Sequence, residues 1–172
     1  HIDEHFNQKM TPHDVAVAPQ SLHCYTSKHI EVRRLLRVLL NKITAHDKGD
    51  SGDRLPPQVA NATLATSKSK DEDLFTAQQV TSCIYGIQGM YSEHREVRNL
   101  VEMLSQHTFR CSGTFTTGDI STCLYGMRFK SSDHVEVRRL LGALLVKLAS
   151  SEGTFHNSDL TKCFIGLKSF KS

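Results

Sequence analysis

The stretch FTAQQVTSCIYGI at residues 75–87 decides how this chain is expected to fold, because the chain repeats it. The pattern returns as FTTGDISTCLYGM at 115–127 and as FHNSDLTKCFIGL at 155–167, so the period is 40 residues. A fixed period of this length is typical of proteins built from stacked supersecondary units. We therefore expect an array of similar units.

A second repeated block sets the boundaries of those units. It reads SEHREVRNL at 92–100 and SDHVEVRRL at 132–140, and an earlier copy, SKHIEVRRL, stands at 27–35. That copy lies 65 residues before the one at 92, and the same offset places MTPHDV at 10–15 opposite FTAQQV at 75–80. The sequence therefore predicts three repeats at 10–44, 75–109 and 115–149, a terminal half repeat at 155–172, and an insertion loop at 45–74.

Each repeat contains two helical patterns, which we name the A helix and the B helix. In the A helix, Thr116 stands three residues before Asp119, as Thr76 stands before Gln79, and this spacing is typical of a capping box at a helix start. In the B helix, an acidic residue such as Glu136 falls in the first turn, where the helix dipole favours a carboxylate. The B-helix apolar stripe of the third repeat is Val137, Leu140, Leu141, Leu144 and Leu148.

Apolar residues of the A helix also recur at the spacing of a half-buried helix. One hairpin cannot cover both apolar stripes, so the repeats must stack on one another. The predicted fold class is therefore all-α: an α-solenoid, a right-handed stack of antiparallel helical hairpins that forms one domain over 1–172. Equivalent A-helix positions are expected to be buried between repeats: Val80, Ile120 and Leu160, and Cys83, Cys123 and Cys163.

Composition limits the classes of function. The chain has 172 residues, 38% hydrophobic content and a net charge of +3, which suit one domain and permit polyanion binding without requiring it. No apolar run approaches the ~18 residues of a membrane span, so we expect no membrane insertion. The five cysteines form no Cys-x-x-Cys pair, which disfavours a disulfide framework or zinc site and favours a reducing compartment.

Residues that could carry chemistry fit the repeat better than an active site. No phosphate-binding glycine loop, nucleophile elbow or pair of carboxylates at a strand end is present, so we expect no catalytic residue, cofactor or small-molecule substrate. The repeated cysteines are interpreted as small core residues rather than a row of thiols. His29, His94 and His134 precede the Glu of each B helix, where local hydrogen bonding is favoured over a metal site.

Two features leave alternatives open. Arg33, Arg98 and Arg138 recur at one place in the B helix, either as a solvated face with ion pairs or as a stripe that contacts phosphates. The insertion at 45–74 is rich in Asp, Lys, Ser, Gly and Pro and is expected to be irregular and mobile. It is either a tolerated surface loop or a segment that contacts a partner.

Candidate binding residues are A-helix positions whose polar type varies while the apolar frame stays fixed. Ser82, Thr122 and Lys162 are equivalent to one another, as are Gln88, Arg128 and Lys168. Such variation suits a modular reader of bases, and neutral drift on a surface would also produce it. The candidate RNA-binding residues are Gln78, Ser82, Gln88, Thr122, Arg128, Lys162 and Lys168.

The segments YGIQGM at 85–90 and LYGM at 124–127, together with the Glu-Val-Arg block, resemble the helical-hairpin repeats of organellar RNA-binding proteins. The nearest are octotricopeptide repeats and the related repeats that precede RAP domains. The resemblance covers about 10–172 and lies in repeat length and helix pattern. It implies an α-solenoid in a mitochondrion or plastid, whose A helices line a concave groove for single-stranded RNA.

A second interpretation belongs to another class. HEAT, armadillo and tetratricopeptide arrays bind proteins, and three and a half repeats are ample for one protein segment but make a short reader of RNA. The weak positive charge also favours a protein partner. On this interpretation the chain is a protein-protein interaction scaffold or a structural subunit of a larger assembly.

Overall fold

The computed structural model describes residues 24–47, 75–151 and 153–170, and these residues form helices without strands. The expected all-α class is therefore confirmed. The helices are α2 (Ile30–Asp47), α3 (Ala77–Gly86), α4 (Arg95–Arg110), α5 (Thr117–Gly126), α6 (Val135–Ala149) and α7 (Asn157–Leu167). The A helix expected in the first repeat and most of the insertion loop lie outside the described residues. Helix α2 continues to Asp47, past the expected boundary at 44.

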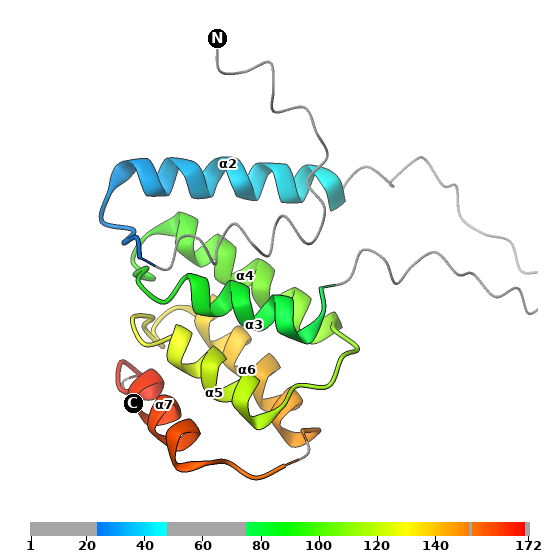
Figure 1. Cartoon of the computed structure of the whole chain (residues 1–172). Coiled ribbons are helices and arrows are strands. Elements are labelled where there is room, and N and C mark those ends of the chain that lie inside the picture. The colour runs from blue at the N-terminus through cyan, green and yellow to red at the C-terminus, as the bar shows by residue number, and fades with distance from the viewer. Residues whose placement is uncertain (1–23, 48–74, 152, 171–172) are drawn as a thin grey trace, which may run out of the picture.

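The helices lie in two layers (Figure 1). Helices α3, α5 and α7 contact one another in succession, and α2, α4 and α6 form a second succession beside them. Helix α3 packs on α4 and α5 on α6 across the layers, and each of these pairs runs in opposite directions (Figure 1). The A helices therefore form one layer and the B helices the other.

The starts of the A helices follow the capping pattern read from the sequence. The amide of Gln79 donates to Thr76 Oγ1 at 3.2 Å, and the amide of Thr76 donates to Gln79 Oε1 at 2.9 Å. Thr116 and Asp119 make the same two bonds at 3.1 and 3.0 Å. These exchanges satisfy amides that have no partner within the helix, so α3 and α5 begin where the sequence predicts.

Burial confirms most of the expected core and corrects one part of it. Val80, Cys83 and Cys123 are fully buried, and Ile120 is 1% exposed. Leu160, however, is 41% exposed, so the prediction that it would be buried between repeats was wrong. Helix α5 packs against α3, α6 and α7, whereas α7 packs mainly against α5 within the described part of the chain. Cys163, on the same helix, is only half-buried for the same reason.

Close backbone approach explains one recurring residue of the repeat. Gly126 and Gly166 are the next-to-last residues of the motif copies at 115–127 and 155–167. A Cβ at Gly126 would overlap the carbonyl oxygen of Ile84, and a Cβ at Gly166 would overlap that of Leu124. Only glycine permits this approach. Successive A helices therefore pack backbone to backbone at their last turns.

Candidate functional site

The turns between A and B helices are held together from one repeat to the next. We call the side formed by residues 24–29, 87–94 and 127–134 the turn edge. The hydroxyl of Ser27 accepts the amide of Tyr91 at 2.9 Å, and the hydroxyl of Ser92 accepts the amide of Ser131 at 2.8 Å. Ser27 and Ser92 occupy the same repeat position and are fully buried. Each turn is thus fixed against the next.

Lys130 adds a buried link at this edge. Its Nζ donates to the carbonyl oxygens of Ile87 and Met90, both at 2.7 Å, and the side chain is fully buried. Burial lowers the pKa of Lys130 to about 7, and the nearby Arg128 guanidinium contributes to the shift. These two hydrogen bonds give the carbonyl oxygens of the preceding turn a partner in place of water. The link ties the turn after α5 to the turn after α3.

The recurring arginines of the B helices brace their own turns. Nη1 of Arg33, Arg98 and Arg138 donates to the carbonyl oxygen of Ser27, Ser92 and Ser132, respectively, at 3.3, 3.0 and 2.6 Å. The Arg98 Nε also lies 3.9 Å from Glu136 Oε1 on the next B helix. The bond to the Ser carbonyl oxygen, which all three arginines share, gives the repetition a structural cause beyond ion pairing.

Aromatic rings and two cations form a continuous series of contacts at the turn edge and on the last turns of α3 and α5. Lys28 Nζ lies 5.1 Å from the Tyr91 ring centroid, and Tyr91 stacks on Phe129 at 5.3 Å. The Arg128 Cζ lies 5.1 Å from the Phe129 centroid and 4.5 Å from that of Tyr125. Tyr125 in turn stacks on Tyr85 at 6.3 Å. We name these six residues the aromatic-cation row: Lys28, Tyr85, Tyr91, Tyr125, Arg128 and Phe129.

The row crosses from the first repeat to the third and is open to solvent along its length. Lys28 and Phe129 are exposed, and the other four side chains are half-buried. Arg128 is held in place because its Nη1 donates to Gln88 Oε1 at 2.6 Å. A guanidinium fixed in this way presents its remaining donors in one orientation.

The structure brings together two of the predicted site residues and separates the others. Gln88 and Arg128 meet at the row, where Gln88 is 5% exposed and serves Arg128 rather than a ligand. Lys162 Nζ lies 3.8 Å from Asp159 Oδ1. The remaining predicted residues are half-buried or exposed along the A layer: Gln78, Ser82, Thr122 and Lys168.

Cations are scarce on the A helices themselves. Helices α3 and α5 contain no Lys or Arg, and α7 contains only Lys162. The other solvent-accessible cations near the A layer are Lys28 and Arg128 at the turn edge and Lys168 at the end of α7. Sequence reasoning missed Lys28 and the four aromatic residues of the row. The available signal was a Tyr at one repeat position, Tyr85 and Tyr125, whereas the pairing of Tyr91 with Phe129 depends on tertiary packing.

The cysteines behave as core residues. Burial raises the pKa of the Cys83 and Cys123 thiols to about 12, so neither is a thiolate at neutral pH. The Cys123 Sγ donates to Thr81 Oγ1 at 3.7 Å across two A helices. Within the described ranges, no group of three His, Cys, Asp or Glu side chains could hold a metal ion.

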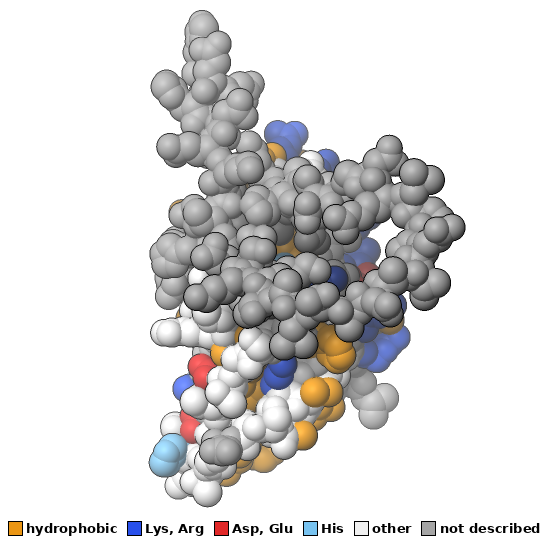
Figure 2. Space-filling view, turned by 90° about the vertical axis from the view of Figure 1, so that its right-hand side faces the viewer, with side chains coloured by type: hydrophobic (Ala, Val, Ile, Leu, Met, Phe, Trp, Pro, Cys, Tyr) orange, Lys and Arg blue, Asp and Glu red, His pale blue; other side chains and the backbone are white. Residues whose placement is uncertain are grey.

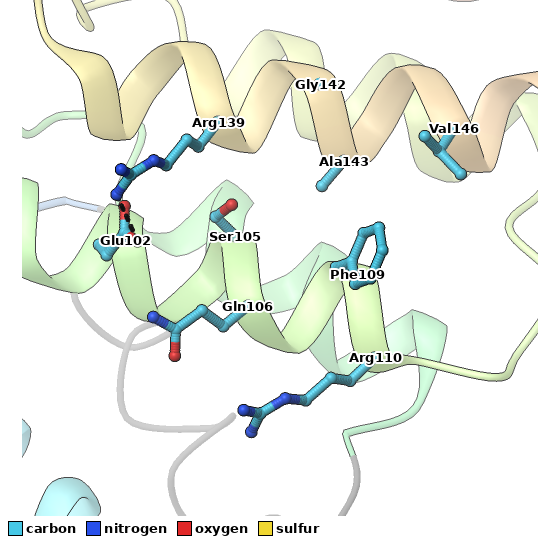
Figure 3. Close-up of a pocket in the computed structure, with 9 residues that line it drawn as sticks. All are labelled: Glu102, Ser105, Gln106, Phe109, Arg110, Arg139, Gly142, Ala143 and Val146. Carbon is cyan, nitrogen blue, oxygen red and sulfur yellow. Dashed lines mark hydrogen bonds and ion pairs between the residues drawn. The ribbon is translucent and has the colours of Figure 1, made fainter.

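A second feature lies on the B layer, between α4 and α6 (Figure 3). This α4–α6 groove has a volume of about 470 Å³ and an apolar centre at Phe109, Ala143 and Val146. The ion pair of Arg139 and Glu102, at 2.9 Å, lies across one end. Phe109 is 68% exposed. On the side where α4 and α6 end, hydrophobic side chains gather with Lys and Arg beside them (Figure 2).

Comparison with known protein families, with curated proteins and with solved structures finds no match for this chain. Among the residues that the structure describes, no helix has both the length and the apolar character needed to cross a membrane. Function must therefore be argued from the surfaces themselves.

Proposed function

We propose that the protein is a non-catalytic α-solenoid, with three helical-hairpin repeats and a half repeat, that binds single-stranded RNA at the aromatic-cation row. Proteins hold single strands by stacking bases on aromatic rings and by placing cations along the phosphates. The row offers both, since it contains four rings and two cations in contact with one another over three successive repeats. The resemblance to octotricopeptide repeats supports the same class of ligand.

The observation that carries the proposal is the placement of Arg128. Its guanidinium lies over the rings of Tyr125 and Phe129 and is fixed by Gln88. Because this side chain is ordered before a ligand arrives, binding costs less conformational entropy. The turn edge is also rigid, because Ser92 and Lys130 fix adjoining turns to one another.

The predicted A-helix residues extend this surface. Ser82 and Thr122 occupy one repeat position on α3 and α5, about one helical turn before Tyr85 and Tyr125 of the row, and Lys162 occupies it on α7. Their polar groups differ from repeat to repeat, as a surface that distinguishes bases requires. We place the bases over the row and Ser82, Thr122 and Lys162. Lys168 lies at the end of α7, where it would hold a phosphate.

The test is a fluorescence-anisotropy titration of a short labelled single-stranded RNA at several salt concentrations. Replacing Arg128, Lys162 and Lys168 by Ala should weaken binding and reduce the slope of log affinity against log salt by roughly 0.7 for each phosphate that no longer meets a cation. The matched control replaces Arg34, Arg95 and Arg110, three exposed arginines of the B helices, and should leave the slope near that of the intact protein.

Stacking is tested separately. Replacing Tyr91 and Phe129 by Ala should cost about 1–3 kcal/mol for each base that stacks there, with little change in the salt slope. The control is Phe109→Ala, which removes an exposed ring from the opposite layer. An intact protein without salt-dependent RNA binding, or variants that bind as well as the intact protein, would reject the RNA proposal.

A protein-binding scaffold is the second candidate, and the α4–α6 groove favours it. Phe109 exposes most of its ring beside Ala143 and Val146, with Arg110 at the rim (Figure 3). An apolar groove with a charged rim suits an amphipathic helix. This candidate takes precedence if RNA does not bind, and Phe109→Ala should then weaken capture of the partner while Tyr91→Ala should not.

A further inference from the structure

Helix α7 has an exposed apolar face, whereas the equivalent face of α5 is buried. Leu160 is 41% exposed, Leu167 40% and Phe164 73%. The residues that correspond to Leu160 and Leu167 in α5 are Ile120 and Met127, and both are buried. The difference follows from the neighbours, because α5 packs against the B helix α6, and α7 packs mainly against α5.

In the described part of the chain, the adjoining edge of α6 carries an arginine that lacks the glutamate partner its equivalent has. Glu96 of α4 pairs with Arg37 of α2, and Glu136 of α6 lies 3.9 Å from Arg98 of α4. In α4 and in α6, the Glu of the first turn therefore pairs with an arginine of the preceding B helix. Arg138 is the α6 residue that corresponds to Arg98, and within the described residues no carboxylate is paired with it.

We propose that α7 and the neighbouring edge of α6 form a docking site for an amphipathic helix with the pattern of this protein's own B helices. That pattern is a Glu in the first turn, directly followed by the first residue of an apolar stripe. The stripe covers Leu160 and Leu167, and the Glu reaches Arg138. The docked helix then continues both layers, as α6 does beside α4 and α5.

The observations favour this occupant over a second folded copy of the chain. The inner faces of the B helices are already covered, since Val97, Val137 and Leu140 are fully buried. A folded copy cannot present such a face without unfolding part of its own array. The site therefore fits a helix that is not packed elsewhere. Arg138 favours a partner with an acidic residue in its first turn. A lipid surface has no such carboxylate at a fixed position beside an apolar stripe.

The experiment uses the full chain and a labelled peptide with the sequence of residues 131–150, which contains α6. Anisotropy should show saturable binding, and the mixture should show more helix by circular dichroism than the sum of its parts, because a short free helix is marginal in water. A peptide with Val137→Asp and Leu140→Asp serves as the matched negative control and should not bind.

Two protein variants locate the site. Leu160→Asp should weaken peptide binding by at least about tenfold, since it places a charge in the covered face. Val38→Asp makes the same kind of change at an exposed position of α2, away from α6 and α7, and should leave binding unchanged. Both variants should retain the helix content of the intact chain, because neither residue is buried.

A charge reversal tests the role of Arg138. The peptide with Glu136→Arg should bind the intact chain several-fold more weakly, and the chain with Arg138→Glu should recover affinity for that peptide. Absence of saturable binding overturns the proposal, as does full binding by Leu160→Asp, which would mean that the peptide exchanges with α6. If the intact chain ignores the peptide and Leu160→Asp turns a dimer into a monomer in sedimentation, the occupant is a second copy and the proposal fails.

Discussion

Helices α5 and α7 have the same repeated pattern but different surroundings. In both, an Asp in the first turn, Asp119 or Asp159, accepts the amide of the N-cap residue, and a glycine in the last turn touches the preceding A helix. Ile120 is nevertheless buried, whereas its equivalent Leu160 is exposed. Local pattern thus determines that a helix forms and which face is apolar, but a neighbouring helix determines whether that face is covered.

Truncation of the paired residues should give the largest difference between the two helices. Ile120→Ala should lower the free energy of unfolding by about 2–5 kcal/mol, because it leaves a cavity between packed helices. Leu160→Ala should cost less than about 1 kcal/mol, since water already reaches that side chain. Urea denaturation of both variants measures the difference, and equal losses would show that α7 is covered in solution.

Substitution of the contact glycine in α5 should destabilise the protein nearly as much as truncation of Ile120. Gly126→Ala places a Cβ against the backbone of Ile84, which cannot move aside as a side chain can, and should cost about 1–3 kcal/mol or more. Gly166→Ala should instead loosen α7 alone. Hydrogen exchange distinguishes the outcomes, because the first change should lower protection in α3 and α5 and the second only in α7.

The residues at the equivalent positions after α5 and α7 also differ, and one of them should make the stability depend on pH. Lys130 is buried, and its repeat equivalent Phe170 is partly buried. Because the folded pKa of Lys130 lies near 7, below the unfolded value of 10.5, the unfolded chain binds more protons between these values. Stability should therefore rise with pH from about 7 to 9, by up to about 1.4 kcal/mol per unit. Above pH 9 the unfolded thiols of Cys83 and Cys123 lose protons that the folded thiols keep, so their contribution lowers stability there.

Lys130→Met is the control for this titration, since Met90 shows that the repeat accepts Met at the equivalent position. Urea denaturation at several pH values should show a flatter profile for the variant between pH 7 and 9, below the range in which the thiols titrate. Arg128, which lowers the pKa, and Glu93, which raises it, remain in both proteins. A slope that survives the substitution would assign it to other groups.

The smallest effect is expected at Gly142, in the middle of α6. A Cβ there meets nothing within 4 Å, unlike one at Gly126. Gly142→Ala should therefore stabilise the protein by up to about 1 kcal/mol through helix propensity alone. Thermal denaturation measures it, and a loss of stability would indicate that the α4–α6 groove is narrower in solution.

Much of the fold follows from short-range features of the sequence. The 40-residue period, the capping pairs at Thr76 and Thr116 and the apolar spacing involve residues within one helix or one repeat. Such features do not depend on distant neighbours, so the all-α class and the helix starts of α3 and α5 could be predicted. The candidate site could be predicted only in part, because Arg128 lies at the row whereas Gln88 supports it from within.

By itself, the sequence determined where helices begin, which faces are apolar and how the units repeat, because these properties depend on contacts a few residues apart. Only the tertiary structure decided that Tyr91 stacks on Phe129, that Arg33, Arg98 and Arg138 brace their turns, and that Leu160 stays exposed. The physical reason is that a side chain's burial and partners depend on the helix placed beside it. Helices with the same repeated pattern, such as α5 and α7, therefore acquire different surfaces.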